Sequence, residues 1–484
     1  MAYTTINKSS DYFRIKTYAG NSTNNTAITW DETDTNMQPD FLWLKQRTVA
    51  DQEHWLCDSV RGAEYFLESD TNNTQSDGTG GFDSFDTNGF TVDNTARTNR
   101  GTMVGWGWLA GGTAPTKTYK VVVVSDSGNK YRFRNSADDT TFGSSAVTLD
   151  LQEGGTYTFD VSDSTVNSHP FVLGTSSGVD GSYSTGVTYK LDGVTKTYSQ
   201  YTSGFSSATS RQLIITVAGS APTLYYNCSV HSGMGGAINT NSKHGSSNFD
   251  GTLQTLVSEN TTAGFSVVRW TGTTNATIGH GLGVKPAMII CKSMSVGSTP
   301  WLIWHKNLDS SSENENYLLF SDAAQAHYSN YWGSGGITNQ VFGVAADNLN
   351  NNRGDMVGYV FAEKPGYCKI GKYDGNADSD GAFIYTGFKP SFVLIKKTDD
   401  QGYWVINDTH RNSRDVKKSN DSDRWIYPGG RDAEYDAASY PMDLVSNGFK
   451  IRHTGNYQNS NNSYIYMAIG QSIVGSNNIP ATAR

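Results

Sequence analysis

Four side chains in the middle of the chain have the types and spacing of a metal site. Cys228 ends an apolar run, His231 follows three residues later and Met234 three residues after that, while His169 stands alone upstream. A thiolate and two imidazoles can form a trigonal plane of ligands, and a thioether can add a weak axial contact, which is the donor set of type 1 copper. We therefore expect His169, Cys228, His231 and Met234 to bind copper, with another soft metal as the alternative.

The surrounding sequence indicates how the chain could bring these side chains together. Residues 223–228 form a strand-type run, and a tight turn after it can place the cysteine, the second histidine and the methionine at one centre. His169 must then come from a neighbouring strand. The block at 115–240 that holds all four residues matches no other part of the chain. We expect it to form a separate, inserted domain.

The order of these features resembles the cupredoxin family. A strand ending in Tyr157-Thr158-Phe159, a histidine next to a turn and a Tyr-Tyr-Asn-Cys strand follow one another as in cupredoxins. Two-residue gaps flank His231, as in amicyanin-like members. The resemblance implies a Greek-key β-sandwich with a type 1 copper site. One residue departs from the family: cupredoxins usually follow the upstream histidine with an asparagine that braces the copper loop, whereas this chain has Pro170.

Two other interpretations of the same residues stay open. The sandwich could persist as a spacer whose metal site has lapsed. Cys228 could instead be a nucleophile activated by His231, although the sequence offers no third group to orient that histidine. Because all four ligand types occur at workable spacing, we expect metal binding.

Outside this block the chain repeats itself three times. Residues 99–106 read Asn-Arg-Gly-Thr-Met-Val-Gly-Trp, residues 352–359 read Asn-Arg-Gly-Asp-Met-Val-Gly-Tyr, and a weaker copy occupies 462–468. Each copy closes a longer unit, and in every unit a proline opens the same apolar strand, where a missing N–H costs no ladder bond. These prolines are Pro39, Pro286 and Pro390. The pattern indicates a threefold array interrupted by one foreign block.

The units read as short strands joined by Gly, Asn and Ser turns, with no convincing helical stretch. We therefore expect an all-β protein, with three repeated antiparallel β-sandwich domains and one inserted sandwich. The expected boundaries are an N-terminal arm at 1–10, repeat 1 at 11–114, the inserted domain at 115–240, a linker at 241–262, repeat 2 at 263–365 and repeat 3 with a C-terminal tail at 366–484.

Composition and charge exclude several classes of protein. The 484 residues carry a formal net charge of −9, so no basic surplus is available to neutralise nucleic-acid phosphates. No apolar run reaches the length of a membrane span and the first residues lack an apolar secretion core, so we expect synthesis in a cytosol and no membrane insertion. The scattered cysteines do not suit a disulfide framework. Three of them, Cys57, Cys291 and Cys368, lie in apolar runs and are expected to be buried.

Aromatic residues outside the repeated strands are candidates for carbohydrate binding, because aromatic faces pack on sugar rings while Asn and Asp bond hydroxyls. The candidates are Tyr328, Tyr331, Trp332, Trp425, Tyr427, Tyr435 and Tyr440. We select Tyr331, Trp332, Trp425 and Tyr427 as the expected ligand-binding set. The alternative for each of them is packing of its loop against the core of its own unit.

The repeated units also resemble a repeat domain of unassigned function in structural proteins of tailed phages that infect marine bacteria. The residues that carry this resemblance lie at 3–13, 38–45, 58–62 and 85–90. The inserted block is similar to modules set into the same phage proteins. The resemblance implies a virion component.

From this resemblance we expect a non-enzymatic virion structural protein, associated with the tail as a tail fibre or receptor-binding protein, whose loops attach to the host surface. The alternatives are a capsid decoration protein and a cupredoxin-type copper protein anchored by structural repeats. Expected partners are other virion subunits, further copies of the chain in a trimer, and a host glycan or protein. A glycan depolymerase would need paired carboxylates in a cleft. The densest acidic group, at 421–436, is spaced like a solvated loop.

Overall fold

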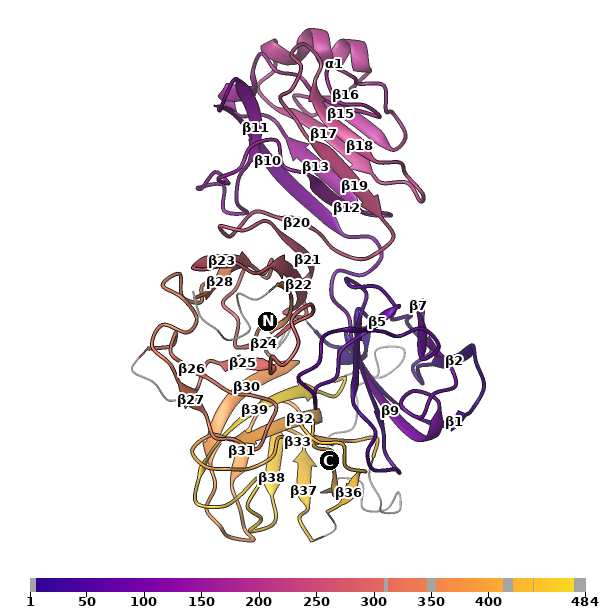
Figure 1. The fold of residues 1–484 in the computed structure, drawn as a ribbon, viewed down its shortest axis with the longest axis vertical. Helices are drawn as coiled ribbons and strands as arrows, with labels where there is room; N and C mark the ends of the chain where they lie inside the picture. Colours follow the sequence, from indigo (N-terminus) through magenta and orange to yellow (C-terminus); the bar gives the residue numbers. More distant parts are fainter. Residues whose placement is uncertain (1–5, 309–311, 346–353, 412–420, 438, 474–484) are drawn as a thin grey trace.

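The computed structural model describes residues 6–308, 312–345, 354–411, 421–437 and 439–473. The fold is all-β, as the sequence predicts, and α1 (Tyr198–Gly204) is the one α-helix in these ranges. A broad body made of the three repeated units carries the inserted domain at one end (Figure 1). Within the same ranges, no helix combines the length and the apolarity that crossing a bilayer demands.

Each repeated unit is built on a four-stranded antiparallel arrangement with the same strand order. In the first unit the order is β1 (Phe13–Asn21), β9 (Arg100–Trp108), β3 (Phe41–Gln46) and β4 (Trp55–Asp58). In the second it is β22 (Phe265–Thr271), β29 (Asp355–Phe361), β24 (Met288–Ser293) and β25 (Leu302–His305). In the third it is β30 (Cys368–Asp374), β39 (Ser463–Gly470), β32 (Pro390–Lys397) and β33 (Val405–Asp408).

The strand that carries the repeated motif therefore lies between the first and second strands of the arrangement, counted along the chain. The first strands are β1, β22 and β30, and the second strands are β3, β24 and β32. Residues 352–353, which open the second copy of the motif, lie outside the described residues. The pairing of β3, β24 and β32 with their neighbours defines equivalent positions in the three units. In particular, β4, β25 and β33 end at equivalent residues, which are Asp58, His305 and Asp408.

The three sheets share one core. Alternate residues of each sheet face this core, where equivalent positions of the three units meet. Two such sets are Trp43, Ile290 and Leu394 on β3, β24 and β32, and Trp106, Tyr359 and Met467 on β9, β29 and β39. Since no unit can bury this inner face without the other two, the units are parts of one body rather than independent domains.

The outer face of each four-stranded sheet is also buried, against a smaller sheet of the same unit. In the first unit the small sheet contains β2 (Thr26–Thr29), β8 (Gly89–Val92) and β7 (Phe82–Asp86); in the second, β23 (Ala276–Gly279) and β28 (Val341–Val344); in the third, β31 (Phe383–Tyr385), β38 (Gly448–Ile451), β37 (Met442–Val445) and β34 (Asp421–Ser422). Each pair of sheets encloses its own apolar cluster. This arrangement explains why the strands after the three prolines are apolar at successive positions.

A ring of backbone hydrogen bonds closes the three units on one another. In each unit the residue after the second strand accepts an N–H from the preceding unit. The three bonds run from Gln75 to Met294 at 2.9 Å, from Gln325 to Thr398 at 2.8 Å and from Glu434 to Arg47 at 2.7 Å. Each unit thus donates to the next and the third donates to the first, so the body has a pseudo-threefold arrangement.

Two expected boundaries differ from the structure. Residues 241–262 do not form a linker, because β20 (Ser246–Asn248) and β21 (Thr255–Asn260) extend the large sheet of the second unit. The apolar alternation of these strands is too short to stand out in the sequence. In the N-terminal arm, Ile6 is buried in the shared core. The described end of the arm is therefore part of the body.

The inserted domain is a sandwich of two sheets around its own core. The larger sheet has the order β11 (Asn129–Phe133), β10 (Thr116–Ser125), β13 (Thr156–Asp160), β17 (Arg211–Thr216), β15 (Val187–Leu191) and β16 (Val194–Lys196). The smaller has β12 (Leu149–Gln152), β19 (Ala237–Asn241), β18 (Leu224–Cys228) and β14 (Phe171–Gly174). The pairs β10–β13 and β12–β19 are parallel, and the other pairs are antiparallel.

One buried carboxylate holds both segments that connect this domain to the body. Asp40 is fully buried in the first unit and accepts hydrogen bonds from the backbone N–H of Ala110 at 2.8 Å and of Gly112 at 2.9 Å, where the chain leaves the body. Where the chain returns, the Nδ1 of His244 pairs with the same carboxylate. The hydroxyl of Ser59 donates a fourth bond at 2.6 Å. One acidic side chain therefore binds both connecting segments at the base of the insertion.

Candidate metal centre

Strand pairing brings the first histidine to the cysteine. Cys228 is the last residue of β18 and pairs with Phe171, the first residue of β14. His169 lies two positions before β14, so its side chain is beside the end of β18. The turn after β18 then carries His231 back to the same end. The sandwich thereby assembles three of the four expected ligands from two segments that are far apart in the sequence.

The ligand atoms of these three residues face one another. The Sγ of Cys228 lies 3.6 Å from the Nδ1 of His231 and 3.9 Å from the Nδ1 of His169, and the two Nδ1 atoms are 3.1 Å apart. A thiolate sulfur at about 2.3 Å and imidazole nitrogens at about 2.0 Å from a common trigonal centre would be separated by about 3.7 Å (sulfur to nitrogen) and about 3.5 Å (nitrogen to nitrogen). The observed separations fit one metal ion.

The three residues of the cluster differ in their exposure to solvent. Cys228 is fully buried and His169 is 6% exposed, whereas His231 is exposed. Burial, and then the neighbouring charge of His231, lower the pKa of His169. A neutral imidazole is the form that binds a metal. The cluster is therefore a pocket of soft and borderline donors with one side open to solvent.

Backbone hydrogen bonds hold the turn that carries the cluster. The N–H of Val230 points to the Sγ of Cys228 at 3.5 Å, an interaction that favours a thiolate. The N–H of Ser229 donates to the carbonyl of Pro170 at 3.0 Å, next to His169. In this chain a main-chain bond at Pro170 thus ties together the two segments of the site.

Two further residues that the sequence did not single out support His169. The side-chain amide of Asn129, on β11, lies 3.3 Å from the Nε2 of this histidine, and the hydroxyl of Tyr131 donates to its carbonyl at 2.8 Å. The contact joins the Nδ2 of Asn129 to the Nε2 of His169 and positions the ring whose Nδ1 faces the cluster. Such outer contacts orient metal ligands. No local motif marks either residue, because both come from a different strand.

Met234, the fourth expected ligand, is buried in the turn after β18. Its side chain belongs to the apolar core of the inserted domain, and its carbonyl accepts a hydrogen bond of 2.9 Å from the N–H of Tyr131. The three-donor cluster stands without it. An axial role for its thioether remains a prediction.

The other three cysteines are structural. Cys57, Cys291 and Cys368 are buried in the apolar clusters of the body, as predicted. Burial raises the pKa of the Cys57 and Cys291 thiols to about 12. They therefore remain protonated at neutral pH.

Two of the four expected ligand-binding aromatics are not available to a ligand. Tyr331 and Trp332 are fully buried in the cluster of the second unit, where Tyr331 stacks on Tyr317 with ring centroids 4.4 Å apart. The indole Nε1 of Trp332 donates to the carbonyl of Asn316 at 3.0 Å. Their assignment to a surface site was wrong, since loop position indicates exposure only when the loop does not fold back on the sheet. Trp425, which is also buried at 2% exposure, and the half-buried Tyr427 line a cavity of the third unit.

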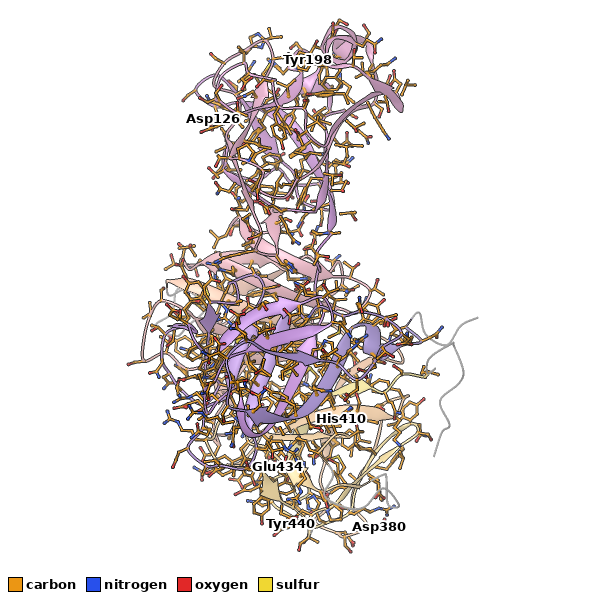
Figure 2. All side chains as sticks on the ribbon, turned by 90° about the vertical axis from the view of Figure 1, so that its right-hand side faces the viewer. Asp126, Tyr198, Asp380, His410, Glu434 and Tyr440 are labelled. Carbon is orange, nitrogen blue, oxygen red and sulfur yellow. The ribbon has the colours of Figure 1, made fainter. Side chains whose placement is uncertain are left out.

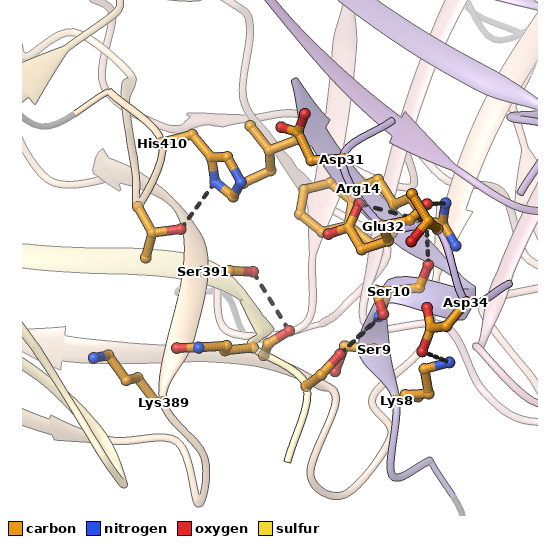
Figure 3. A pocket seen from close by; sticks show the side chains of 17 residues that line it. Lys8, Ser9, Ser10, Arg14, Asp31, Glu32, Asp34, Lys389, Ser391 and His410 are labelled. Atoms are coloured by element: carbon orange, nitrogen blue, oxygen red, sulfur yellow. Dashed lines mark hydrogen bonds and ion pairs between the residues drawn. The ribbon is translucent and has the colours of Figure 1, made fainter. Parts of the chain in front are cut away.

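A larger cavity, of about 600 Å³, lies between the first and third units (Figure 3). Three of its acidic side chains each have a basic partner: Asp31 pairs with Lys16, Glu32 with Arg14 and Asp34 with Lys8. On the opposite wall, the imidazole of His410 lies 3.1 Å from the hydroxyl of Thr409. Because these three carboxylates are paired within the protein, we assign the cavity no ligand.

In the densest acidic group, Glu434 and Asp436 are each bound to arginine. Both carboxylate oxygens of Glu434 bond the guanidinium of Arg47 at 2.8 Å, and one of them also bonds Arg411 at 3.0 Å. Asp436 pairs with Arg424 at 3.2 Å. Glu434 therefore fixes the third unit to the first.

Three equivalent β-units around one core, with a fourth sandwich that carries a His–Cys–His cluster, define an all-β protein with an inserted domain. Within this class, the chain belongs to a family of unknown function: residues 8–132 and 237–472 match the family described as Domain of unknown function (DUF7483). The matched residues span the three repeated units and leave out most of the inserted domain. No curated protein and no solved structure matches the chain.

Proposed function

We propose that the inserted domain is a cupredoxin-like metal domain whose ion, copper, is held by His169, Cys228 and His231 with Met234 as an axial ligand. The observation that supports this most strongly is the convergence of one thiol sulfur and two Nδ1 atoms at separations that suit a single ion. A thiolate with two imidazoles selects soft metals, and copper heads the affinity order among divalent first-row ions.

Copper bound by a thiolate and two imidazoles supplies one-electron chemistry. The protein's own part is to orient the donors: the end of β18 presents the sulfur, the N–H of Val230 stabilises it as a thiolate, and Asn129 sets the ring of His169. The exposed His231 is the ligand nearest to solvent. The same donors in a site without copper could hold another soft metal, which is the alternative for this domain.

The test is a titration of the reduced, purified chain with copper(II), followed by visible absorption. We expect an intense thiolate-to-copper band at one equivalent, and its loss in Cys228→Ser. Cys291→Ser is the matched control, because this thiol is also buried but lies in an apolar cluster of the second unit. A band that survives in Cys228→Ser, or no band together with unchanged thermal stability, would contradict a metal site and leave the domain as a spacer.

For the body, we propose a non-enzymatic structural role in a virion, associated with the tail and engaged in host attachment, with capsid decoration as the alternative. The resemblance of the repeated units to phage structural domains suggests the location. The closed ring of three units, which buries one common core, suits a rigid mounting for surface loops. The body would then carry the metal domain at one end.

Counting the chain in purified particles by quantitative mass spectrometry tests this role. A tail part would occur in small multiples of three or six, and a decoration protein would match the capsid lattice. In an adsorption assay, micromolar purified protein is expected to compete with phage for host cells. If particles contain no copies of the chain, the structural role fails whatever the metal titration shows.

A further inference from the structure

The small sheet of the third unit ends in a strand that presents two aromatic side chains to solvent. This strand, β31, comes first in the order β31, β38, β37, β34, so it has a neighbouring strand on one side only (Figure 1). Phe383 is 49% exposed and Tyr385 is 60% exposed, whereas Ile384 between them is buried in the core of the unit. The loop that leads into β31 contains Asp380, which lies at the end of the molecule away from the inserted domain (Figure 2).

The pseudo-threefold arrangement shows that the fold does not require these two rings. Each small sheet buries one isoleucine opposite one phenylalanine, and the three equivalent pairs are Ile28–Phe90, Ile278–Phe342 and Ile384–Phe449. The residues on either side of the isoleucine differ between the units. They are Ala27 and Thr29 in the first unit, Thr277 and Gly279 in the second, and Phe383 and Tyr385 in the third.

The first two units protect this edge in different ways. In the second unit another segment of the chain covers it: the N–H of Thr277 donates to the hydroxyl of Thr252 at 2.9 Å, and Leu253 forms a parallel bridge with Ile278. In the first unit the edge is exposed, but its small or polar side chains offer little apolar surface to a partner. The described residues of the third unit show neither form of protection. An exposed apolar edge of this kind is a template for pairing with a further strand.

The backbone groups of the two aromatic residues face the open side of β31. The carbonyl of Ala382 and the N–H of Thr386 both form hydrogen bonds of 3.0 Å with the segment that contains β38. Along an antiparallel ladder, successive residues turn their backbone groups alternately toward one neighbouring strand and the other. Phe383 and Tyr385 therefore turn their N–H and carbonyl groups outward, where these groups can bond a partner strand.

This spacing makes the edge complementary to itself. When a second β31 lies antiparallel beside the first, about a twofold axis at Ile384, Phe383 of each copy is opposite Tyr385 of the other copy. Both members of each pair turn their backbone groups toward the facing strand, so each pair can exchange two hydrogen bonds. The aromatic side chains become direct cross-strand neighbours on one face, an arrangement that stabilises antiparallel sheets.

We propose that two copies of the chain associate through β31, so that the small sheets of two third units join into one antiparallel sheet. Because a twofold contact closes with two copies, the trimer expected from the sequence would need a different surface. The association depends on neither the metal site nor the virion role.

The size of the edge determines how tightly the copies should bind. An aromatic side chain has about 200 Å² of surface, so two half-exposed rings offer roughly 200 Å² per copy in total. Contacts that bury less than about 1,200 Å² are typical of weak, reversible complexes. We therefore expect a dissociation constant of about 10–100 µM.

The test is sedimentation velocity of the purified full chain from about 1 to about 200 µM, a range that brackets the expected dissociation constant. We expect the monomer to give way to a dimer as the concentration rises. Tyr385→Lys puts a charge on the edge and should raise the dissociation constant at least about tenfold. Thr29→Lys is the matched control, because it puts the same charge on the equivalent, exposed position of the first unit. It should leave the dimer unchanged, and circular dichroism should show that both variants are folded.

Disulfide formation tests the register of the two strands. In the proposed pairing, position 383 of one copy lies opposite position 385 of the other with Cα atoms about 5.5 Å apart, a distance that a disulfide spans. A mixture of Phe383→Cys and Tyr385→Cys should therefore form a covalent dimer under mild oxidation. Each variant alone places its two introduced cysteines on a diagonal of about 7–8 Å and should link much less. The wild type, whose four cysteines are buried, should not link.

Three results would overturn the proposal. The first is a monomer at every concentration, and the second is a dimer that Tyr385→Lys leaves intact, which would assign the contact to another surface. The third is covalent linking of the single variants as readily as of the mixture, because the twofold register forbids it. A dimer that Tyr385→Lys weakens, together with a disulfide confined to the mixture, would establish the contact.

Discussion

The indole Nε1 of Trp106, in the first unit, donates a hydrogen bond of 2.9 Å to the buried carboxylate of Asp408, in the third. Tyr359 of the second unit, at the position equivalent to Trp106, makes the same contact with Asp58 of the first at 2.9 Å. In the remaining junction the acid is replaced by His305 and the donor by Met467. Donor and acceptor are thus present or absent together, as expected for contacts that hold one unit to the next.

The Trp106–Asp408 contact should contribute measurable stability. Trp106→Phe removes the donor and leaves a buried carboxylate with one partner fewer, which we expect to lower the free energy of unfolding by about 1.5–3 kcal/mol beyond the loss of packing. Trp108→Phe is the control, because the Nε1 of Trp108 is buried in the same core without an acceptor among the described residues. Urea unfolding followed by circular dichroism measures both variants. Equal losses would show that the contact adds nothing.

Three equivalent buried lysines should make stability depend on alkaline pH. Lys45, Lys292 and Lys396 are fully buried, and the ammonium of Lys292, for example, donates to the carbonyl of Thr299 at 2.6 Å. Burial lowers the pKa of each from 10.5 to about 8. Between these values the unfolded chain holds more protons than the folded one, so the free energy of unfolding should rise with pH.

Lys292→Met removes one of these groups and should flatten that rise by up to about 1.4 kcal/mol per pH unit. Measurements from pH 8 to about 9.5 stay below the range in which tyrosines titrate. Lys285→Met is the control, because the Lys285 side chain is 47% exposed and pairs with Glu313 on the surface. If both variants keep the slope of the wild type, the buried lysines do not carry the pH dependence.

Much of the body could be predicted from the sequence, because strand patterns and turn residues are local. The prolines at Pro39, Pro286 and Pro390 and the apolar runs after them located the second strand of every unit. The closure of the units could not be predicted in this way. It depends on backbone groups, such as the N–H of Gln75 and the carbonyl of Met294, that have no signature in residue type.

The candidate sites likewise contain features that the local sequence predicts and features that it does not. The spacing of Cys228 and His231 is local and was sufficient to find the cluster, whereas Asn129 reaches it from β11 without any sequence signal. Tyr331 was wrongly assigned to a surface because its residue type does not reveal the direction of its ring, which stacks on Tyr317.

The connection between body and inserted domain should depend more on Asp40 than on its partner His244. Burial alone would raise the pKa of Asp40. His244, Ser59 and the N–H of Gly112 stabilise the carboxylate and hold this pKa below its ordinary value. Asp40→Ala leaves four donors without their acceptor, so we expect a loss of about 3–5 kcal/mol in the free energy of unfolding. His244→Ala leaves the carboxylate with three donors and should cost about half as much.

Differential scanning calorimetry of the two variants measures this difference. Because the pKa of Asp40 is depressed in the folded state, its contribution should be present at neutral pH and disappear as the pH falls through that value. The wild type and Asp40→Ala should therefore converge in acid. Two results would contradict the role of Asp40 as the common acceptor. One is a difference in unfolding free energy between the wild type and Asp40→Ala that stays the same at every pH, and the other is a larger loss of stability in His244→Ala than in Asp40→Ala.

Asn129 should tune the metal cluster without being a ligand. Its side-chain amide meets the Nε2 of His169, so Asn129→Ala removes the group that sets the orientation of this ring. Loss of such an outer contact typically weakens metal affinity by about 10–100-fold, and we expect a decrease of this size in a competitive copper titration. Asn239→Ala, on an exposed position of β19 in the same domain, is the control and should leave the affinity unchanged. The two variants should have equal thermal stability without copper and differ only when it is added, because Asn129 acts through His169 rather than through the core. If Asn129→Ala binds copper as tightly as Asn239→Ala, the ring of His169 is held by the bond from Tyr131 to its carbonyl, and Asn129 has no part in the site.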